Sequence, residues 1–350
     1  MKCTSPHSTL DALPRKWSPD LNSINPNNFS CSCCNSRCLL QFPFSPTIEE
    51  VLQVLPNSRT DSVTPSRVRA IDAPGPLCFW HLASLDAPTV ALAWSLAFAW
   101  VARVRLPLWV PALLALAVWS VYVADRLLDA RAGLRSANLH RLRERHLFHW
   151  RHRRVLVPLA IATGLGAAWI IFTLMPVGAR ERNSVLAAAA IVYFTRVHTG
   201  GKGSPLLSRI LSKEFLVGLL FTAGCALPAW SRAALPHHAL VWSLLIPVIF
   251  FVLLAWLNCH AIDRWEASPD SASSMPIFSQ ASLIAIAGLL LAAILSSAQP
   301  RSAALLLCGA AAALLLALLD SLRSRLTPVA LRAAADLVLL TPLLLTPFFR

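Results

Sequence analysis

The chain has 350 residues, of which 56% are hydrophobic and 14% are charged, and its formal net charge is +14 at pH 7. Soluble domains carry about 25% charged residues, so this composition excludes an ordinary soluble protein and indicates an integral membrane protein. The positive charge does not indicate a nucleic-acid partner, because the arginines flank apolar runs instead of alternating with aromatic residues.

The first 75 residues differ from the rest of the chain. They are rich in serine, proline and asparagine and contain no long apolar run. We therefore expect residues 1–75 to be a disordered tail, or an over-extended reading frame, ahead of a membrane domain over residues 76–350. The tail cysteines, Cys3, Cys31, Cys33, Cys34 and Cys38, lack paired metal-knuckle spacing, so a structural metal there is the less favoured interpretation.

Apolar runs then recur along the chain and predict an all-α, polytopic membrane protein with about nine transmembrane helices. The expected spans lie near residues 87–104, 106–124, 155–175, 184–200, 213–230, 239–259, 276–296, 302–320 and 330–347. Most lysines and arginines fall in the loops after the second, fourth, sixth and eighth spans. The positive-inside rule then places those loops and the N-terminus in the cytoplasm, with the spans in the inner membrane.

Two short acidic motifs stand at the ends of apolar runs, where acids are costly and are functional-site candidates. The first contains Asp125 and Asp129, which share one face of a helix. Paired carboxylates suit Mg²⁺ bound together with substrate phosphates. The competing interpretation is that each aspartate pairs with a local arginine, Arg126 or Arg131.

The second motif follows the sixth expected span and contains Asn258, His260, Asp263 and Glu266. Its two acids are one helical turn apart, although a single polar loop of this kind is common in membrane proteins. The significance of both motifs lies in their expected position on one face of the membrane. Together they predict a shared metal and phosphate site.

The motifs and their order along the chain resemble those of the UbiA-type intramembrane prenyltransferases. Ala124-Asp125-Arg126 through Asp129 is similar to the first Asp-rich motif of that family, and Asp263 to Glu266 stand where its second motif lies. Arg135-Ser-Ala-Asn138, Tyr193 to Arg196 and Lys213 to Gly218 are similar to further family elements. The resemblance covers roughly residues 80–350 and implies a bundle of nine helices.

The resemblance implies transfer of an isoprenoid chain from an allylic prenyl diphosphate to an aromatic or other lipid-soluble acceptor. Asp125, Asp129 and Asp263 would be catalytic and would bind Mg²⁺, with Glu266 and Asn258 as further ligands. Substrate would contact Arg135, Tyr193, Arg196, Lys213, His260 and Tyr122. Arginine and lysine at such positions are also common as membrane anchors, and aromatic residues as an interfacial belt.

One further segment and one further residue are candidates for a role at this face. Residues 141–154 are rich in arginine and histidine and predict a basic interfacial helix that could cover the diphosphate. Asp336 lies four residues after Arg332, so the two are expected to pair, unless Asp336 orients a residue of the site.

Two other functions remain open. The first is a non-catalytic transporter or assembly protein on a degraded prenyltransferase scaffold, because Val121-Tyr122 stands where the family's first motif begins with Asn-Asp. The second is a CDP-alcohol phosphotransferase, which Asp129 to Gly133 loosely resembles. The further paired acids of that family are absent downstream, which makes this the weakest of the three functions.

Overall fold

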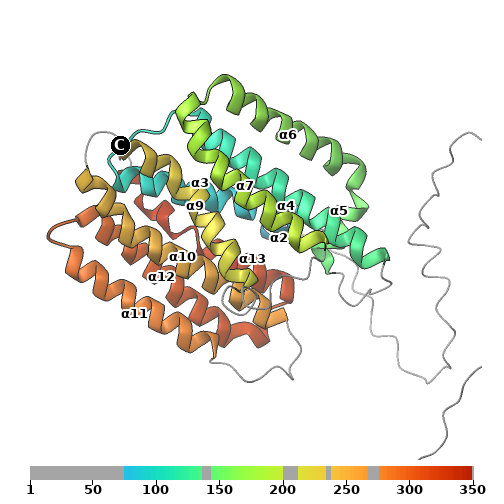
Figure 1. Ribbon diagram of the computed structural model, residues 1–350. Coiled ribbons are helices and arrows are strands. Elements are labelled where there is room, and N and C mark those ends of the chain that lie inside the picture. Colours follow the sequence, from blue (N-terminus) through green and yellow to red (C-terminus); the bar gives the residue numbers. More distant parts are fainter. Residues whose placement is uncertain (1–74, 136–142, 200–211, 234–237, 267–275, 349–350) are drawn as a thin grey trace, which may run out of the picture. The chain divides into compact units, whose positions relative to one another are not determined.

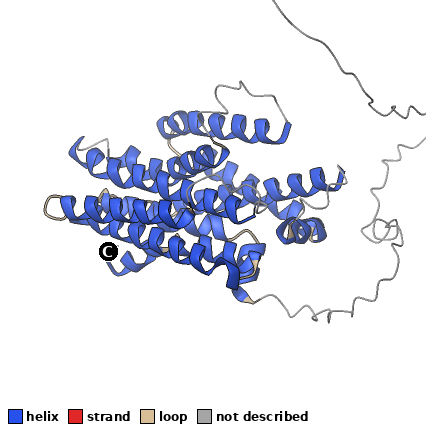
Figure 2. Ribbon diagram, turned by 90° about the horizontal axis from the view of Figure 1, so that it is seen from below, coloured by secondary structure: helices blue, strands red, loops and turns tan. Residues whose placement is uncertain are grey.

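The computed structural model describes residues 75–135, 143–199, 212–233, 238–266 and 276–348. The predicted tail, 1–75, lies outside this part of the chain except for its last residue. Within the described ranges the secondary structure is entirely helical, with no strand (Figure 2). The all-α prediction is therefore confirmed for the described residues.

The helices follow the apolar runs closely (Figure 1). Their bounds are α2 Pro76–Leu82, α3 Asp86–Val101, α4 Trp109–Arg135, α5 Glu144–Arg151, α6 Arg153–Thr173, α7 Val177–Thr199, α9 Lys213–Ala233, α10 His238–Glu266, α11 Ile277–Leu295, α12 Pro300–Leu322 and α13 Pro328–Val338, with short 3₁₀ helices η2 Arg323–Arg325 and η3 Thr341–Phe348. Helices α4 and α10 continue past their apolar runs, so both acidic motifs lie on helices.

Seven described helical segments are long and apolar enough to cross a membrane, and the count rises to eight if α2 and α3 form one bent span. The protein is thus a polytopic membrane protein. The α7 helix covers the fourth expected span but is not one of these segments, since charged residues such as Arg180, Glu181 and Arg182 occupy its first turns. The count of nine spans stays a prediction.

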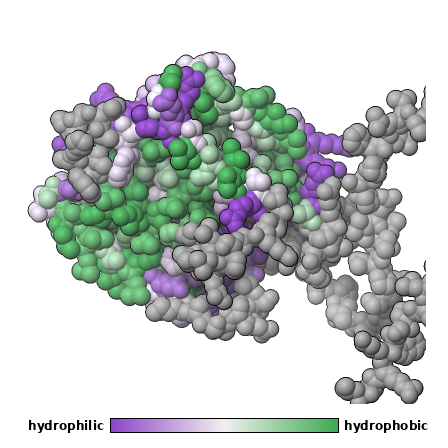
Figure 3. Space-filling view, viewed as in Figure 1, coloured by the Kyte–Doolittle hydropathy of each residue, from purple (hydrophilic) through white to green (hydrophobic). Residues whose placement is uncertain are grey.

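The outer surfaces of the helices are apolar, as lipid contact requires. Over α10 to α12 the visible surface is mostly hydrophobic, and hydrophilic residues gather toward helix ends (Figure 3). On α11, for example, Leu283, Ile286, Leu290 and Ile294 are all exposed. An apolar surface of this extent on a soluble protein would be an aggregation site, whereas in a bilayer lipid chains cover it.

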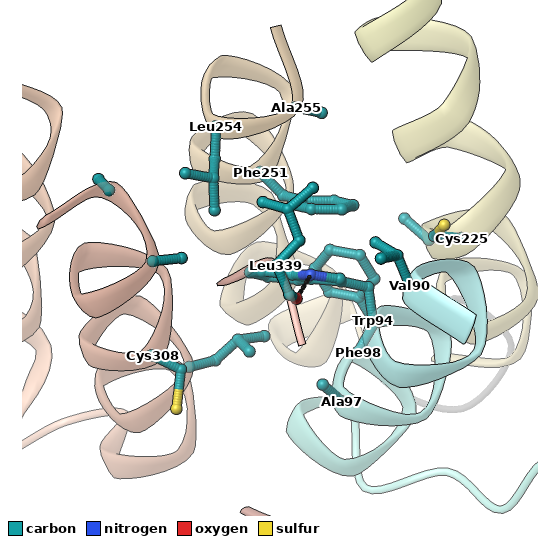
Figure 4. Packing of buried hydrophobic residues seen from close by; sticks show 14 of the residues in the cluster. Val90, Trp94, Ala97, Phe98, Cys225, Phe251, Leu254, Ala255, Cys308 and Leu339 are labelled. Atoms are coloured by element: carbon teal, nitrogen blue, oxygen red, sulfur yellow. Dashed lines mark hydrogen bonds between the residues drawn. The ribbon is translucent and has the colours of Figure 1, made fainter. Parts of the chain in front are cut away.

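Helix α3 lies at the centre of the bundle, where it contacts α4, α9, α10, α12 and α13. Its Trp94 is 1% exposed, and its ring stacks on Phe251 of α10 with centroids 3.8 Å apart. The Trp94 indole Nε1 donates a hydrogen bond to the Leu339 carbonyl at 2.8 Å (Figure 4). One side chain therefore connects α3, α10 and the end of the chain.

Close approach of α9 and α10 depends on Gly218. A Cβ atom at this position would lie 2.9 Å from the Trp256 backbone nitrogen, which cannot move aside without moving α10. Small residues at such crossings let membrane helices approach each other closely. Gly218 thereby fixes the place of α10, and with it the second acidic motif.

Replacing Gly218 by alanine should therefore destabilise the protein, by about 1–3 kcal/mol as in other overpacked interiors. Gly224, on the same helix, has no atom within 4 Å of an added Cβ. There alanine should be neutral or stabilising by up to about 1 kcal/mol, because it favours the helix. Thermal unfolding of both variants in detergent measures the difference, and equal midpoints would contradict the proposed role of Gly218.

Candidate functional site

Asp125 and Asp129 lie on α4, one turn apart, and both are half-buried. The Asp129 side chain is 44% exposed, and its Oδ2 atom lies 3.9 Å from His146 Nε2 on α5. Tyr193 of α7 is within electrostatic reach of Asp125. The first motif thus faces α5 and α7 and remains partly exposed.

In the second motif the two acids have different surroundings. Asp263 is exposed. The Glu266 carboxylate forms ion pairs with three arginines, contacting Arg143, Arg145 at 3.2 Å and Arg332 at 3.0 Å. The oxygens of Glu266 are thus engaged by guanidinium groups, which the sequence did not predict because two of these arginines lie more than 100 positions away along the chain.

Helix α5 connects the two motifs. Through His146 it approaches Asp129 of α4, and through Arg145 it contacts Glu266 of α10. His149 is fully buried, and its Nε2 lies 3.2 Å from the hydroxyl of Ser84, in the turn between α2 and α3. The expected interfacial helix is confirmed as a helix, and it is anchored on the bundle by its histidines.

Both α5 histidines are held neutral. Burial, and then the charge of neighbouring arginines beginning with Arg145, lowers the pKa of His146 to about 3. Burial also lowers the pKa of His149 to about 4, partly offset by its hydrogen bond to the Arg145 carbonyl. Because an unfolded histidine titrates near 6.5, the unfolded state binds more protons below that pH.

Stability from these histidines is therefore complete above about pH 6.5 and falls as the pH drops toward 4. From about pH 7 to about pH 5 the loss should reach at most about 2 kcal/mol per histidine. The slope of unfolding midpoint against pH should flatten in His149→Gln, which cannot be protonated. The matched control is His152→Gln, on an exposed position of the same segment, which should keep the wild-type slope. Equal slopes in both variants would rule out this role.

Four arginines gather beside the two acidic motifs: Arg126 of α4, Arg143 and Arg145 beside or on α5, and Arg332 of α13. Burial, followed by the charges of Arg332, Arg126 and Arg143, lowers the pKa of Arg145 to about 8. Among the described residues, Arg126 Nε and Nη1 and Arg332 Nε are buried N–H groups without a hydrogen-bond partner. We call these four residues the arginine cluster.

Repulsion within the arginine cluster and its unpartnered donors favour binding of an anion. Each buried donor left unpaired costs roughly 1–3 kcal/mol, which a phosphate oxygen would recover. Arg126 is 3% exposed, and its guanidinium lies over the Tyr122 ring, 5.9 Å from the centroid. Tyr122, expected to contact substrate, is thus part of the surroundings of the cluster.

A second polar group is buried beside the arginine cluster. His81 Nδ1 lies 2.6 Å from Asp86 Oδ2 and 3.5 Å from Asp336 Oδ2. Asn258 Nδ2 donates to Asp336 Oδ1 at 3.1 Å, and Arg126 Nη2 lies 3.8 Å from Asp86 Oδ2. We refer to His81, Asp86, Asp336 and Asn258 as the histidine–aspartate cluster.

Sequence reasoning missed most of this cluster. Asp86 Oδ1 accepts a hydrogen bond from the Ala87 amide, and its Oδ2 lies against His81. Asp336 contacts His81 and Asn258, and its expected partner Arg332 contacts Glu266. The one available signal was the occurrence of acids, Asp86 and Asp336, within or beside apolar runs.

The other predicted site residues lie at helix ends or on α10. Arg196 and Lys213 are exposed, near the end of α7 and at the start of α9. The His260 ring stacks on Trp256 with centroids 5.4 Å apart. Arg135 is the last residue of α4, and its side chain lies outside the described part of the structure.

No protein-family model, curated protein or solved structure matches this chain, so its fold class and the geometry of its charged clusters stand on their own.

Proposed function

We propose that the protein is a membrane-embedded prenyltransferase, which passes an isoprenoid chain from an allylic prenyl diphosphate to an aromatic or other lipid-soluble acceptor. The observation that carries the proposal is the arginine cluster, with its unpartnered N–H groups, beside both acidic motifs. A diphosphate is a multivalent anion, and arginine binds its oxygens bidentately. A prenyl chain would reside in the lipid-facing part of the bundle.

The reaction breaks the bond between the first carbon of the prenyl chain and the diphosphate oxygen attached to it. The electron pair leaves with the diphosphate, whose developing charge Arg126, Arg145 and Arg332 stabilise. The allylic carbocation forms a bond to a nucleophilic carbon or oxygen of the acceptor, and the acceptor's proton passes to water or to the departing diphosphate. Tyr122, next to the cluster, provides an aromatic ring for a cationic intermediate.

The proposed metal ligands are Asp125, Asp129 and Asp263. Their exposure fits Mg²⁺, which keeps several waters and is held by few carboxylates together with phosphate. Bound there, Mg²⁺ would neutralise diphosphate charge. Glu266 and Asn258 fit this role less well, since arginines surround Glu266 and Asn258 is hydrogen-bonded to Asp336. We propose that this face lies on the cytoplasmic side of the inner membrane, because the loops on this side carry most of the lysines and arginines.

The alternative is a non-catalytic membrane protein on a related scaffold. The ion pairs of Glu266 favour it, because a carboxylate shared by three arginines is a stable structural link. In that case the arginine cluster would join α5, α10 and α13 without binding substrate. Binding and transfer measurements distinguish these functions.

The test uses the full chain, purified in detergent, with labelled farnesyl diphosphate and a panel of aromatic acceptors. Labelled product should form with Mg²⁺ and disappear on chelation. Arg145→Gln should weaken diphosphate binding about tenfold or more, because a hydrogen bond to a charged group is worth about 1.5–3 kcal/mol. The matched control is Arg153→Gln, an exposed arginine that contacts Trp150, which should leave binding unchanged.

Absence of both diphosphate binding and transfer, with any acceptor, would favour the non-catalytic alternative. Equal loss of binding in Arg145→Gln and Arg153→Gln would show that general positive charge, and not the arginine cluster, attracts the anion.

A further inference from the structure

The four residues of the histidine–aspartate cluster come from four helices, α2, α3, α10 and α13. A ring nitrogen of His81 and one carboxylate oxygen each from Asp86 and Asp336 all lie within 4.8 Å of one another. His81 and Asp86 are 1% and 2% exposed. Atoms at these separations could each reach a single ion placed between them, at the roughly 2.0–2.2 Å typical of nitrogen and oxygen ligands.

The backbone bends sharply between His81 and Asp86. Helices α2 and α3 meet at an angle of 89°, and His81 and Asp86 lie on either side of the bend. In the connecting turn Ser84 is fully buried and has a φ of 58°, a conformation that is rare for residues other than glycine. The bend turns two residues only five positions apart toward the same point, where Asp336 of α13 joins them.

Asn258 provides an independent indication of a ligand. It is 5% exposed, and its Oδ1 is buried without a hydrogen-bond partner among the described residues. Its amide already faces the cluster, since Nδ2 lies 3.1 Å from Asp336 Oδ1. The oxygen and nitrogen of an amide are assigned from their surroundings, so turning the group by 180° places Oδ1 toward the cluster. In that orientation Oδ1 would face a cation in the cluster, in place of the hydrogen bond from Nδ2 to Asp336.

We propose that His81, Asp86, Asp336 and Asn258 form a binding site for a divalent transition-metal ion such as Zn²⁺. One imidazole with carboxylate and amide oxygens suits such a borderline ion better than Mg²⁺, which prefers oxygen ligands alone. With His81 neutral, the two negative charges of Asp86 and Asp336 balance the two positive charges of the ion. Arg126, 3.8 Å from Asp86, then orients that carboxylate from outside the ligand set.

The competing arrangement contains no metal. A protonated His81 and Arg126 would together balance Asp86 and Asp336, and the cluster would be a buried ion-pair network. The two arrangements differ in a measurable way, because only the first binds an ion in proportion to the amount of protein. This site is separate from the proposed Mg²⁺ ligands, so its failure would leave the proposed transfer reaction untouched.

The experiment measures Zn²⁺ bound per chain on the full-length protein in detergent. Excess Mg²⁺ is present to occupy all-oxygen sites, and Cys3, Cys31, Cys33, Cys34 and Cys38 are replaced by serine to remove thiolates outside the cluster. We expect about one Zn²⁺ per chain and a rise in the thermal unfolding midpoint on adding Zn²⁺, because an ion that binds only the folded state stabilises it.

His81→Ala and Asp336→Asn should each weaken Zn²⁺ binding by about tenfold or more. His152→Ala, an exposed histidine on the segment after α5, is the matched control and should bind like the parent chain. Where His81→Ala fails to fold, Asn258→Ala and Asn258→Asp serve in its place. Alanine should weaken binding, and aspartate should strengthen it by adding a negative charge.

Binding well below one ion per chain, or equal affinity in the parent chain and in the cluster variants, would overturn the metal site. Either result would establish the histidine–aspartate cluster as an ion-pair network.

Discussion

Asp125→Ala and Asp129→Ala should each reduce prenyl transfer by about a thousandfold or more. In the proposed reaction these carboxylates hold the cation that neutralises the diphosphate. Such charge stabilisation is worth several kcal/mol, and each 1.36 kcal/mol corresponds to a factor of ten in rate. Initial rates with labelled farnesyl diphosphate measure the effect.

In both variants the free energy of unfolding should stay within about 0.5 kcal/mol of the wild-type value, because the two side chains are only half-buried. The matched control is Glu181→Ala, an exposed acid on α7 at the opposite predicted face, which should transfer at the wild-type rate. Full activity in either aspartate variant would show that the metal ligands are wrongly assigned. A large loss of stability would instead indicate a structural role.

Trp94→Ala should destabilise the bundle by about 3–5 kcal/mol, the usual cost of removing a large buried ring. The side chain is 1% exposed, stacks on Phe251 and lies 5.8 Å from Phe98, so its loss opens a cavity among three elements. Membrane helices associate mainly through close van der Waals contact, which such a cavity removes. Thermal unfolding in detergent measures the change.

Trp94→Phe separates the ring from its hydrogen bond. It keeps a stacked ring but leaves the Leu339 carbonyl without its donor, which should cost about 1–3 kcal/mol. Trp169→Ala removes a ring that is 62% exposed on α6 and should change stability by about 0.5 kcal/mol or less. If Trp94→Ala were no worse than Trp169→Ala, the proposed centre of the bundle would be wrong.

Helix α5 shows how the sequence and the structure complement each other. Its arginines and histidines predict a helix at the membrane surface, and a helix is found at Glu144–Arg151. The sequence does not show that His149 would be fully buried against Ser84, or that Arg145 would contact Glu266. Those contacts join residues 65 and 121 positions apart, and no local pattern encodes them.

Local sequence patterns were enough to predict the membrane class, the helical fold and the shared helix face of Asp125 and Asp129. These properties depend on local composition: apolar runs must satisfy their backbone hydrogen bonds internally in lipid, and residues four apart share a helix face. Which charges meet depends on how the helices pack. Asp336 contacts His81, 255 positions away, and Arg332 contacts Glu266, because the α2–α3 bend and the crossing of α10 with α13 bring them together. With many arginines near the helix ends, an acid has many possible partners in sequence, and helix geometry selects one set.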